Sequence, residues 1–266
     1  MHGWEGRILF FRRAFLRKQE SRTLWIKSFL FLDGRFDVIL LVYNFIQKDS
    51  GETLLKMCRE KNIGTTLMKT NPVGGYNLIK ESMEALEKQG KDVPPVYKMI
   101  LPRFKLKADK AAEYIKKHNL QNNNEIREAA IRFVLSNPDV NAACISFRNF
   151  DDVENHLKLS GARLTAEDRA LLAAYREGCG PFYCRHACGQ CEPRCPYSVP
   201  VNTIMRYNHY FGAQGREKYA MLEYAKLSGR QADLCQKCEG DCERACPYGV
   251  PIHGLLLLAH QTLTLA

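Results

Sequence analysis

Two cysteine-rich stretches decide the C-terminal fold of this chain: CRHACGQCEPRCP at residues 184–196 and CQKCEGDCERACP at residues 235–247. Each carries four cysteines separated by two or three residues, and each ends in Cys-Pro. Thiolates at spacings of this kind hold cubane [4Fe–4S] clusters, and the proline then directs the chain out of the loop because it fixes φ. The stretches therefore predict two [4Fe–4S] clusters. The expected metal ligands are Cys184, Cys188, Cys191, Cys195, Cys235, Cys238, Cys242 and Cys246.

Two groupings of these eight thiols are open. In two-cluster ferredoxins the fourth cysteine of each run ligates the other cluster, which would place Cys246 with the first run and Cys195 with the second. Local grouping would keep the four cysteines of each run together. Either way, the sequence predicts one-electron transfer through the clusters, to or from a redox partner protein.

Three other uses of clustered cysteines compete. Disulfides need an oxidising compartment, and the chain shows no convincing export signal. A structural zinc site, as in a zinc-stabilised interaction module, needs two Cys-x2-Cys pairs rather than two sets of four ending in Cys-Pro. A radical enzyme leaves its fourth iron open, whereas Cys195 is placed to close it. Outside the two runs, Cys58 and Cys144 are expected to be buried thiols, and Cys179 is expected at a helix end.

Composition limits the classes of partner. The 266 residues carry a formal charge of +10, and 45% of them are hydrophobic. No apolar run approaches the length that spans a membrane. No nucleic-acid fold motif is visible, and the basic residues are spread along most of the chain, so an acidic redox partner fits the charge at least as well as nucleic acid does. A reducing cytoplasm is the expected location.

The first residues differ from the rest. Residues 1–30 contain seven Lys and Arg against two Asp and Glu. The stretch 12–18 resembles the core of a twin-arginine signal, but Gln19–Arg22 is polar where an apolar region should begin, and no cleavage site follows. We expect residues 1–32 to be a non-homologous or disordered N-terminal segment.

An α/β pattern begins at Phe36. Apolar and β-branched runs predict strands, and 3.6-residue periodicity predicts helices between them. Alternation of this kind implies parallel pairing, and the apolar run 36–45 is expected to be a strand buried on both faces. The expected strands are 36–45, 63–68 and 141–147; the expected helices are 52–62, 76–89, 107–119, 125–135 and 151–159, with a further helix capped by Thr165 and Asp168. After residue 181, helices are expected at 201–211, 216–227 and 252–263, which favours an α-helical ferredoxin-like domain.

Several of these segments together resemble the aldo-keto reductase family. The run 36–45 resembles the sixth strand of that family's barrel, residues 64–75 resemble the seventh strand and its loop, and residues 129–155 resemble the last helix–strand–helix. The cysteine block resembles the dicluster extension of a bacterial subgroup. The resemblance implies a partial (β/α)8 barrel, its last three βα units at 33–178, followed by an α-helical ferredoxin-like domain at 179–266.

The same resemblance implies that the family's catalytic Asp, Tyr, Lys and His are missing, because they lie on early strands that this chain lacks. No catalytic residue is assigned, and carbonyl reduction is not expected of this chain alone. Three alternatives remain: an electron-transfer component of an oxidoreductase, a truncated non-catalytic remnant, or half of a split NADP-dependent reductase whose other chain supplies the missing strands.

The resemblance to the family's cofactor-binding loop is weaker. By resemblance, Arg148, Asn149 and Lys69 stand where the family binds NADP(H). A strand-to-helix junction such as that at Arg148 can bind phosphate through helix N–H groups. A loop cap is the competing role for these residues. Asp151 and Asp152 are expected to be charges at a helix N-terminus.

Overall fold

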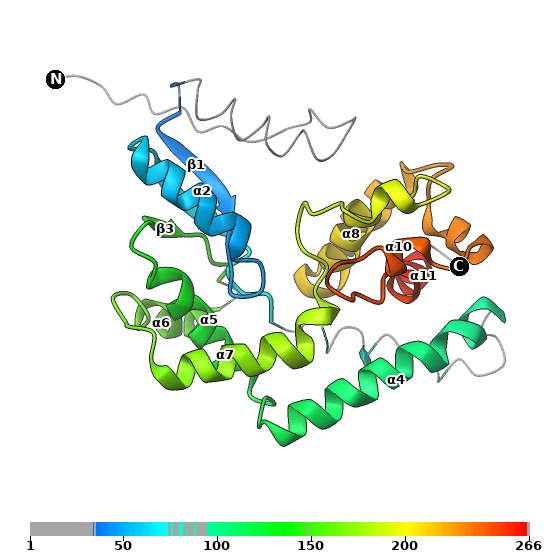
Figure 1. Ribbon diagram of the computed structural model, residues 1–266, viewed down its shortest axis with the longest axis horizontal. Coiled ribbons are helices and arrows are strands. Elements are labelled where there is room, and N and C mark those ends of the chain that lie inside the picture. Colours follow the sequence, from blue (N-terminus) through cyan, green and yellow to red (C-terminus); the bar gives the residue numbers. More distant parts are fainter. Residues whose placement is uncertain are drawn as a thin grey trace. The chain divides into compact units, whose positions relative to one another are not determined.

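The computed structural model of this chain describes residues 34, 36–73, 76, 80, 81, 84, 88, 95–147 and 149–264 (Figure 1). The expected segment 1–32 lies outside them, as does most of the helix expected at 76–89. The chain divides into two compact units. Unit 1 contains the described residues up to Pro72 and Asn122–Ala174, and unit 2 contains those of Val73–Gln121 and Tyr175–Ala266.

Unit 1 is built on a parallel sheet. Its strands are β1 (Val38–Val42), β2 (Gly64–Met68) and β3 (Ala142–Ala143), in the order β1-β2-β3, and both pairings are parallel. Its helices are α2 (Asp49–Glu60), α5 (Asn123–Leu135), α6 (Phe150–Leu157) and most of α7 (Ala166–Cys179). The predicted order of strands and helices is confirmed, although β3 is shorter than expected. The parallel sheet and its helices fit a partial α/β barrel.

Strand β1 buries one face only. Ile39 lies on the face that packs with Cys58 of α2, and Figure 1 shows α2 running alongside β1. On the other face, Val38 and Leu40 are 46% and 43% exposed. The expectation of a strand buried on both faces is therefore wrong. Alternate side chains point to opposite faces of a strand, and the described residues cover one of those faces.

Asn44 joins the chain segments that follow β1 and β2. Its side chain is fully buried, and its Oδ1 accepts from the N–H groups of Ile46 (3.0 Å) and Gln47 (2.8 Å). Its Nδ2 donates to the carbonyl oxygen of Lys69 at 2.9 Å. These bonds fix the loops at the carboxyl ends of the two strands, which is the edge where open α/β sheets bind ligands.

Helix α7 begins at a capping box. The N–H of Asp168 donates to Thr165 Oγ1, and the N–H of Thr165 donates to Asp168 Oδ2, both at 3.0 Å. This confirms the predicted cap. Asp168 also receives two hydrogen bonds from Arg132 of α5, at 2.9 and 2.8 Å, which join the two helices.

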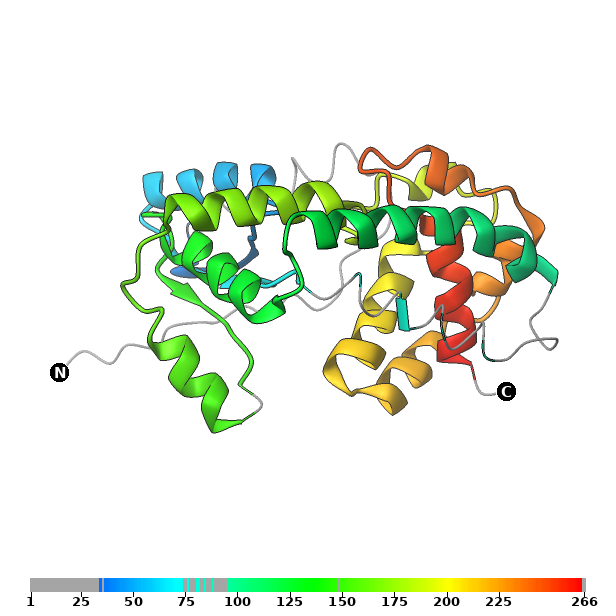
Figure 2. The same ribbon diagram turned by 90° about the horizontal axis from the view of Figure 1, so that it is seen from below.

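The regular elements described in unit 2 are all helical. The unit contains α4 (Pro95–Lys117), α8 (Val201–Gln214), α9 (Glu217–Ala225), α10 (Asp241–Arg244), α11 (Ile252–Leu263), and the 3₁₀ turns η2 (Gly180–Phe182), η3 (Glu192–Arg194) and η4 (Ala232–Lys237). The helices predicted at 201–211, 216–227 and 252–263 are confirmed as α8, α9 and α11. Figure 2 shows α11 (red) beside α8 (yellow).

Helix α11 forms the core of unit 2. Residues 255–258 of α11 are four consecutive buried leucines, and the helix packs against α4, α8, α9, α10 and η4. A helix apolar on all sides is expected to be enclosed by other helices. No helix in the described part of the chain is long and apolar enough to cross a membrane.

The three cysteines outside the two runs differ in burial. Cys58 is buried, as predicted, and Cys179 is buried at the last residue of α7, which confirms the helix-end prediction. Cys144 is exposed, so the prediction of a buried thiol is wrong there. The reason is that β3 ends at Ala143, and Cys144 begins the loop that follows.

Candidate metal centre

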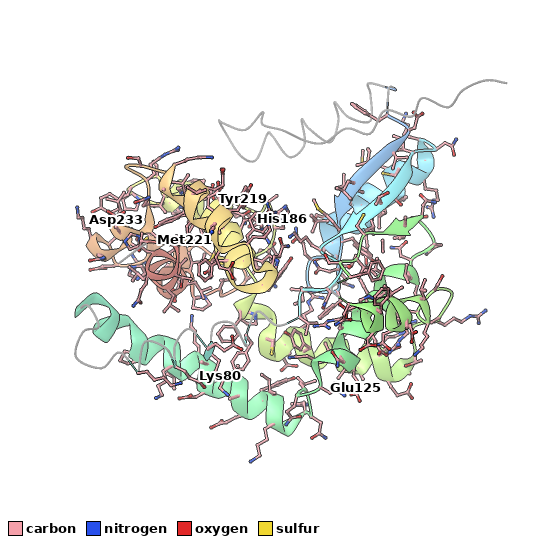
Figure 3. The ribbon with its side chains drawn as sticks, turned by 180° about the vertical axis from the view of Figure 1, so that it is seen from behind. Lys80, Glu125, His186, Tyr219, Met221 and Asp233 are labelled. Atoms are coloured by element: carbon pink, nitrogen blue, oxygen red, sulfur yellow. The ribbon has the colours of Figure 1, made fainter. Side chains whose placement is uncertain are left out.

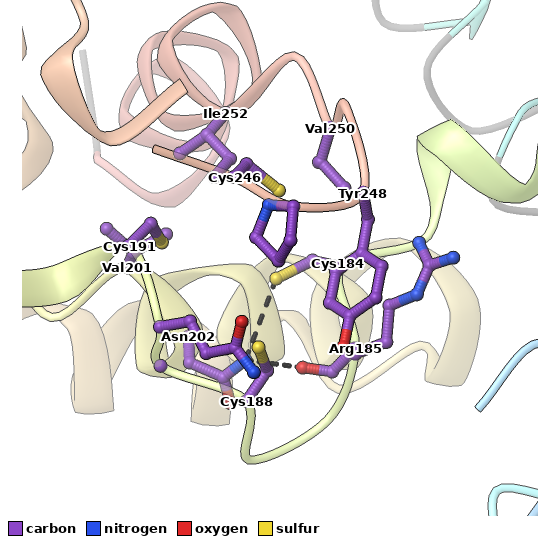
Figure 4. Close-up of a pocket in the computed structure, with 13 residues that line it drawn as sticks. Cys184, Arg185, Cys188, Cys191, Val201, Asn202, Cys246, Tyr248, Val250 and Ile252 are labelled. Carbon is purple, nitrogen blue, oxygen red and sulfur yellow. Dashed lines mark hydrogen bonds between the residues drawn. The ribbon is translucent and has the colours of Figure 1, made fainter. Parts of the chain in front are cut away.

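Four cysteines from distant parts of the sequence line one hollow in unit 2. Its walls include Cys184, Cys188, Cys191 and Cys246 (Figure 4). The first three precede α8, and the fourth precedes α11. Cys195 is not part of this wall. We call these four thiols the first site.

The remaining thiols, Cys195, Cys235, Cys238 and Cys242, form the second site. They lie close enough for a thiolate on one to raise the pKa of another: Cys238, Cys242 and Cys195 raise the pKa of Cys235, and Cys195 and Cys238 raise that of Cys242. Cys191 also interacts with Cys242, so the two sites adjoin.

Burial favours the protonated form of most of these thiols. Burial raises the pKa of Cys184 to about 11 and that of Cys242 to about 12. For Cys184, the Arg206 guanidinium opposes this effect because it favours the thiolate. Burial also raises the pKa of Cys188, Cys191 and Cys235. A metal that binds here must displace these protons, so loading releases acid.

Hydrogen-bond donors already point at two of the sulfurs. The N–H of Val199 donates to Cys195 Sγ at 3.3 Å, and Asn202 Nδ2 donates to Cys184 Sγ at 3.6 Å. The Asn202 amide also donates to the carbonyl oxygen of Arg185 (2.7 Å) and accepts from the N–H of Ala187 (2.9 Å). Asn202 therefore holds the loop of the first run in place while it contacts a sulfur.

A buried arginine contributes to the wall of the first site, with its guanidinium beyond the Tyr248 ring (Figure 4). Arg185 is 8% exposed, and its Nη1 donates to the carbonyl oxygens of Gly180 and Tyr183, both at 2.7 Å. Its guanidinium carbon lies 4.1 Å from the ring centroid of Tyr248, which stands beside it in Figure 4. Burial lowers the pKa of Arg185, an effect opposed most strongly by Tyr248.

Both runs belong to an internal repeat. CPYSVPVN at residues 195–202 returns as CPYGVPIH at residues 246–253. In each copy φ is positive at the fourth residue, 53° at Ser198 and 63° at Gly249. A proline then caps the following helix, Pro200 for α8 and Pro251 for α11. Each Cys-Pro-Tyr turn therefore leads directly into a helix N-terminus.

The repeat identifies a residue that the cysteine spacing missed. His253 occupies the position of Asn202 in the second copy, and it is 7% exposed. Its Nε2 lies 2.8 Å from the carbonyl oxygen of Cys235 and 4.0 Å from Cys238 Sγ. Glu192 and Glu243, also matched by the repeat, accept from the backbone N–H of Asn202 and His253 respectively. Comparison of the chain with itself would have found this pair.

Single-ion binding receives no support. Across the residues that the structure describes, no three His, Cys, Asp or Glu side chains gather so as to hold one metal ion. Structural zinc needs four ligands at about 2.0–2.3 Å from one ion.

The structure describes two of the three expected cofactor-loop residues, Asn149 and Lys69. Arg148 lies outside the described residues. Asn149 is the N-cap of α6, and its Oδ1 accepts from the N–H of Asp152 at 2.8 Å. Lys69 has a φ of 57°, and its carbonyl oxygen accepts from Asn44. Asp151 and Asp152 stand in the first turn of α6, as predicted.

Comparison with known proteins gives one match. The model of the aldo/keto reductase family matches residues 33–177. Neither a curated protein nor a solved structure matches the chain. The matched residues stop before the two cysteine runs, so this comparison bears on the sheet and its helices alone.

Proposed function

The chain belongs to the aldo/keto reductase family, and we propose that it is an iron–sulfur component of an oxidoreductase that transfers single electrons through two [4Fe–4S] clusters. The observation that carries this proposal is the hollow lined by Cys184, Cys188, Cys191 and Cys246. Its four thiols come from both runs, in the crossed grouping that two-cluster ferredoxins use. The second site has the complementary four thiols.

Unpaired donors near the first site also favour an anionic group there. Within the described part of the chain, the Nε atoms of Arg185 and Arg206 are buried and have no hydrogen-bond partner. A buried polar group without a partner is costly. A cubane with four thiolates carries a net charge of about −2, which such donors would stabilise. The residues present therefore fit the group.

The chain's own residues have separable tasks in this function. The cysteine thiolates bind, and once bound each cluster supplies one-electron redox chemistry. Asn202 and the N–H of Val199 donate to sulfur, which stabilises added negative charge. Burial of Cys191 and Cys235 limits the access of water. We propose an acidic redox partner, because the chain carries a formal charge of +10.

Nicotinamide chemistry is not part of this proposal. The Asn149 side chain is engaged as a helix cap. By resemblance, the proton-donating residues of the family lie on strands that precede the matched region. Carbonyl reduction is therefore not proposed for this chain by itself.

The decisive experiment counts iron and acid-labile sulfide in anaerobically purified protein and records its absorption spectrum. About eight of each per chain, with a broad band near ~400 nm, is the expected result for two cubanes. About four of each would restrict the proposal to one cluster. Zinc without sulfide, or no metal after anaerobic reconstitution, would overturn it and favour a non-catalytic remnant.

Single Cys→Ser variants test the crossed grouping. We expect Cys246→Ser to alter the same electron paramagnetic resonance (EPR) signal as Cys184→Ser, and Cys195→Ser to alter the same signal as Cys235→Ser. The opposite pairing, Cys195 with Cys184, would establish local grouping. Cys144→Ser is the matched control, because that thiol is exposed and lies in unit 1.

A second candidate is one half of a split reductase. The exposed apolar side chains of Val38 and Leu40 on β1 favour it, because an uncovered strand of this kind pairs readily with another chain. The test is co-expression with a neighbouring reading frame that encodes the early strands of the family. Co-purification and NADPH oxidation by the pair, both lost in Val38→Lys, are expected. Activity without co-purification would refute this candidate.

A further inference from the structure

Building on the proposed function, we propose that Arg185 and Arg206 give the first site a higher reduction potential than the second site. An electron added to the two sites would then be found mainly on the first site at equilibrium. The two guanidiniums act as positioning residues: they touch no substrate, but their charge decides where the added negative charge is most stable.

Arg185 supplies a positive charge that no carboxylate visibly neutralises. The groups that act on it most strongly are Tyr248, Cys246, Tyr183 and another cation, Arg176. Within the described residues, no ion pair is formed by Arg185. An unpaired buried charge is costly, and an anionic neighbour lowers that cost. The neighbour present is the first site, whose Cys246 and Cys184 line the same hollow.

Arg206 provides a second, independent charge. It lies on α8, and of all charged groups it acts most strongly on Cys184. Among the described residues, its buried Nε finds no hydrogen-bond partner. Two arginines from different segments therefore each carry a buried Nε without a partner among the described residues, and each acts on a thiol of the first site.

The internal repeat allows a matched comparison with the second site. Residues 51 positions apart correspond, as Cys184 does to Cys235 and Cys195 to Cys246. At the position of Arg185 the second copy has Gln236, which is exposed, and at the position of Arg206 it has Leu257, which is fully buried. Both cations are thus replaced by neutral residues in the second copy.

The carboxylates increase the difference. Glu192 and Glu243 occupy matched positions, so they act alike on the two sites, although Lys107 pairs with Glu243 at 3.2 Å. Asp233 of η4, labelled in Figure 3, acts on Cys235, and Phe182 stands at its position in the first copy. At the positions of Arg185, Arg206 and Phe182 the first copy is therefore more positive than the second.

This charge difference gives electron transfer a direction. Clusters held at the two sites would supply one-electron chemistry, and the charges of Arg185 and Arg206 would favour the added electron at the first site over the second. No covalent bond forms or breaks in the chain, and the step requires no proton. The first site is then the point from which an acceptor draws the electron.

The test is an EPR-monitored redox titration with dithionite and mediators, on anaerobic protein shown to hold about eight iron. Arg185→Gln and Arg206→Leu install the residues of the second copy, and Arg185→Lys keeps the charge. The control is Arg230→Gln, which removes an exposed cation after α9. The signal that Cys184→Ser alters identifies the first site.

In the unaltered protein we expect the first site to be reduced before the second. Arg185→Gln should lower the equilibrium constant for reduction of the first site by about tenfold, the scale of one nearby charge at the effective dielectric of a protein. That factor corresponds to about 59 mV for one electron. Arg206→Leu should act in the same direction, while Arg185→Lys and Arg230→Gln should change the constant less than about threefold.

Three results would overturn the inference. They are reduction of both sites together or of the second site first, no change in Arg185→Gln and Arg206→Leu, and an equal shift at both sites. If Arg185→Gln loses iron from the first site while Arg185→Lys keeps it, the guanidinium charge is needed for loading, and Arg206→Leu then decides the question of potential. A protein without iron and sulfide would instead refute the proposed function itself, which the metal count shows before any titration.

Discussion

The pair between Arg132 and Asp168 is expected to be a main source of stability in unit 1. The informative substitution is Asp168→Asn. An asparagine Oδ1 can still accept from the N–H of Thr165, so the cap of α7 is largely kept while the charge on residue 168 is lost. The change therefore isolates the ion pair from the capping box.

The geometry gives the magnitude. The Asp168 side chain is 8% exposed and accepts two hydrogen bonds from a guanidinium that is 20% exposed. Removing one partner of a buried ion pair costs about 3–5 kcal/mol. Because Arg132 keeps some contact with water and with Glu128 at 3.5 Å, the lower end applies. We expect a loss of about 3 kcal/mol, which is roughly 6–12 °C in Tm for a protein of this size.

Thermal and urea unfolding of the two proteins at pH 7 measure the effect, with Arg59→Gln as the control. Arg59 pairs with Asp139 at 3.0 Å, but its side chain is 59% exposed, so its loss should cost at most about 1 kcal/mol. Arg132 lowers the pKa of Asp168, so the stabilisation is present above the unfolded pKa, near 3.8, and is lost as the pH falls through the folded value. The difference between the two proteins should therefore narrow below about pH 4. A variant within about 1 °C of the unaltered protein at pH 7 would refute the reasoning.

Three further outcomes are expected. Gly240→Ala should lower the Tm by more than Gly229→Ala does. Both positions have positive φ, but only at Gly240 does an added Cβ come within 3.0 Å of His253. Equal losses of Tm would contradict this. Asn44→Ala should cost about 2–3 kcal/mol in urea unfolding, because it removes three hydrogen bonds made by a buried side chain. Burial raises the pKa of Cys179 from 9.0 to about 12, so stability should be complete below pH 9 and fall by about 1.4 kcal/mol per pH unit above it, a slope that Cys179→Ala should reduce.

The local features of the fold were readable from the sequence. Capping by Thr165 and Asp168, the limits of α11, and the parallel order of strands depend on residues near one another or on periodicity. The exposure of side chains to solvent was harder to predict from the sequence. Cys144 and the outer side chains of β1 were expected to be buried, but burial depends on what covers a segment, and the sequence of the segment does not contain that information.

The candidate centre was partly predictable. Spacing singled out the eight cysteines, but it left the grouping open, because Cys246 reaches the first run only through tertiary packing. Arg185, Asn202 and His253 gave no signal as single residues. Their significance follows from the repeat. It places Asn202 and His253 at equivalent positions, and it matches Arg185 with a neutral residue, Gln236.

Side chains of the two cysteine runs contact each other, and this affects when the centre can be assembled. Tyr248 packs on Arg185, and the hydroxyl of Tyr197 donates to the carbonyl oxygen of Lys237 at 3.2 Å. Neither site has all its thiols until both runs have been synthesised, because each draws cysteines from both. A nascent chain that exposes the first run alone offers thiols to oxidation before it offers a complete binding site. Under the proposed function, assembly of the centre would be a late, all-or-none event, and yields of the loaded protein should depend on iron delivery after translation has passed Cys246.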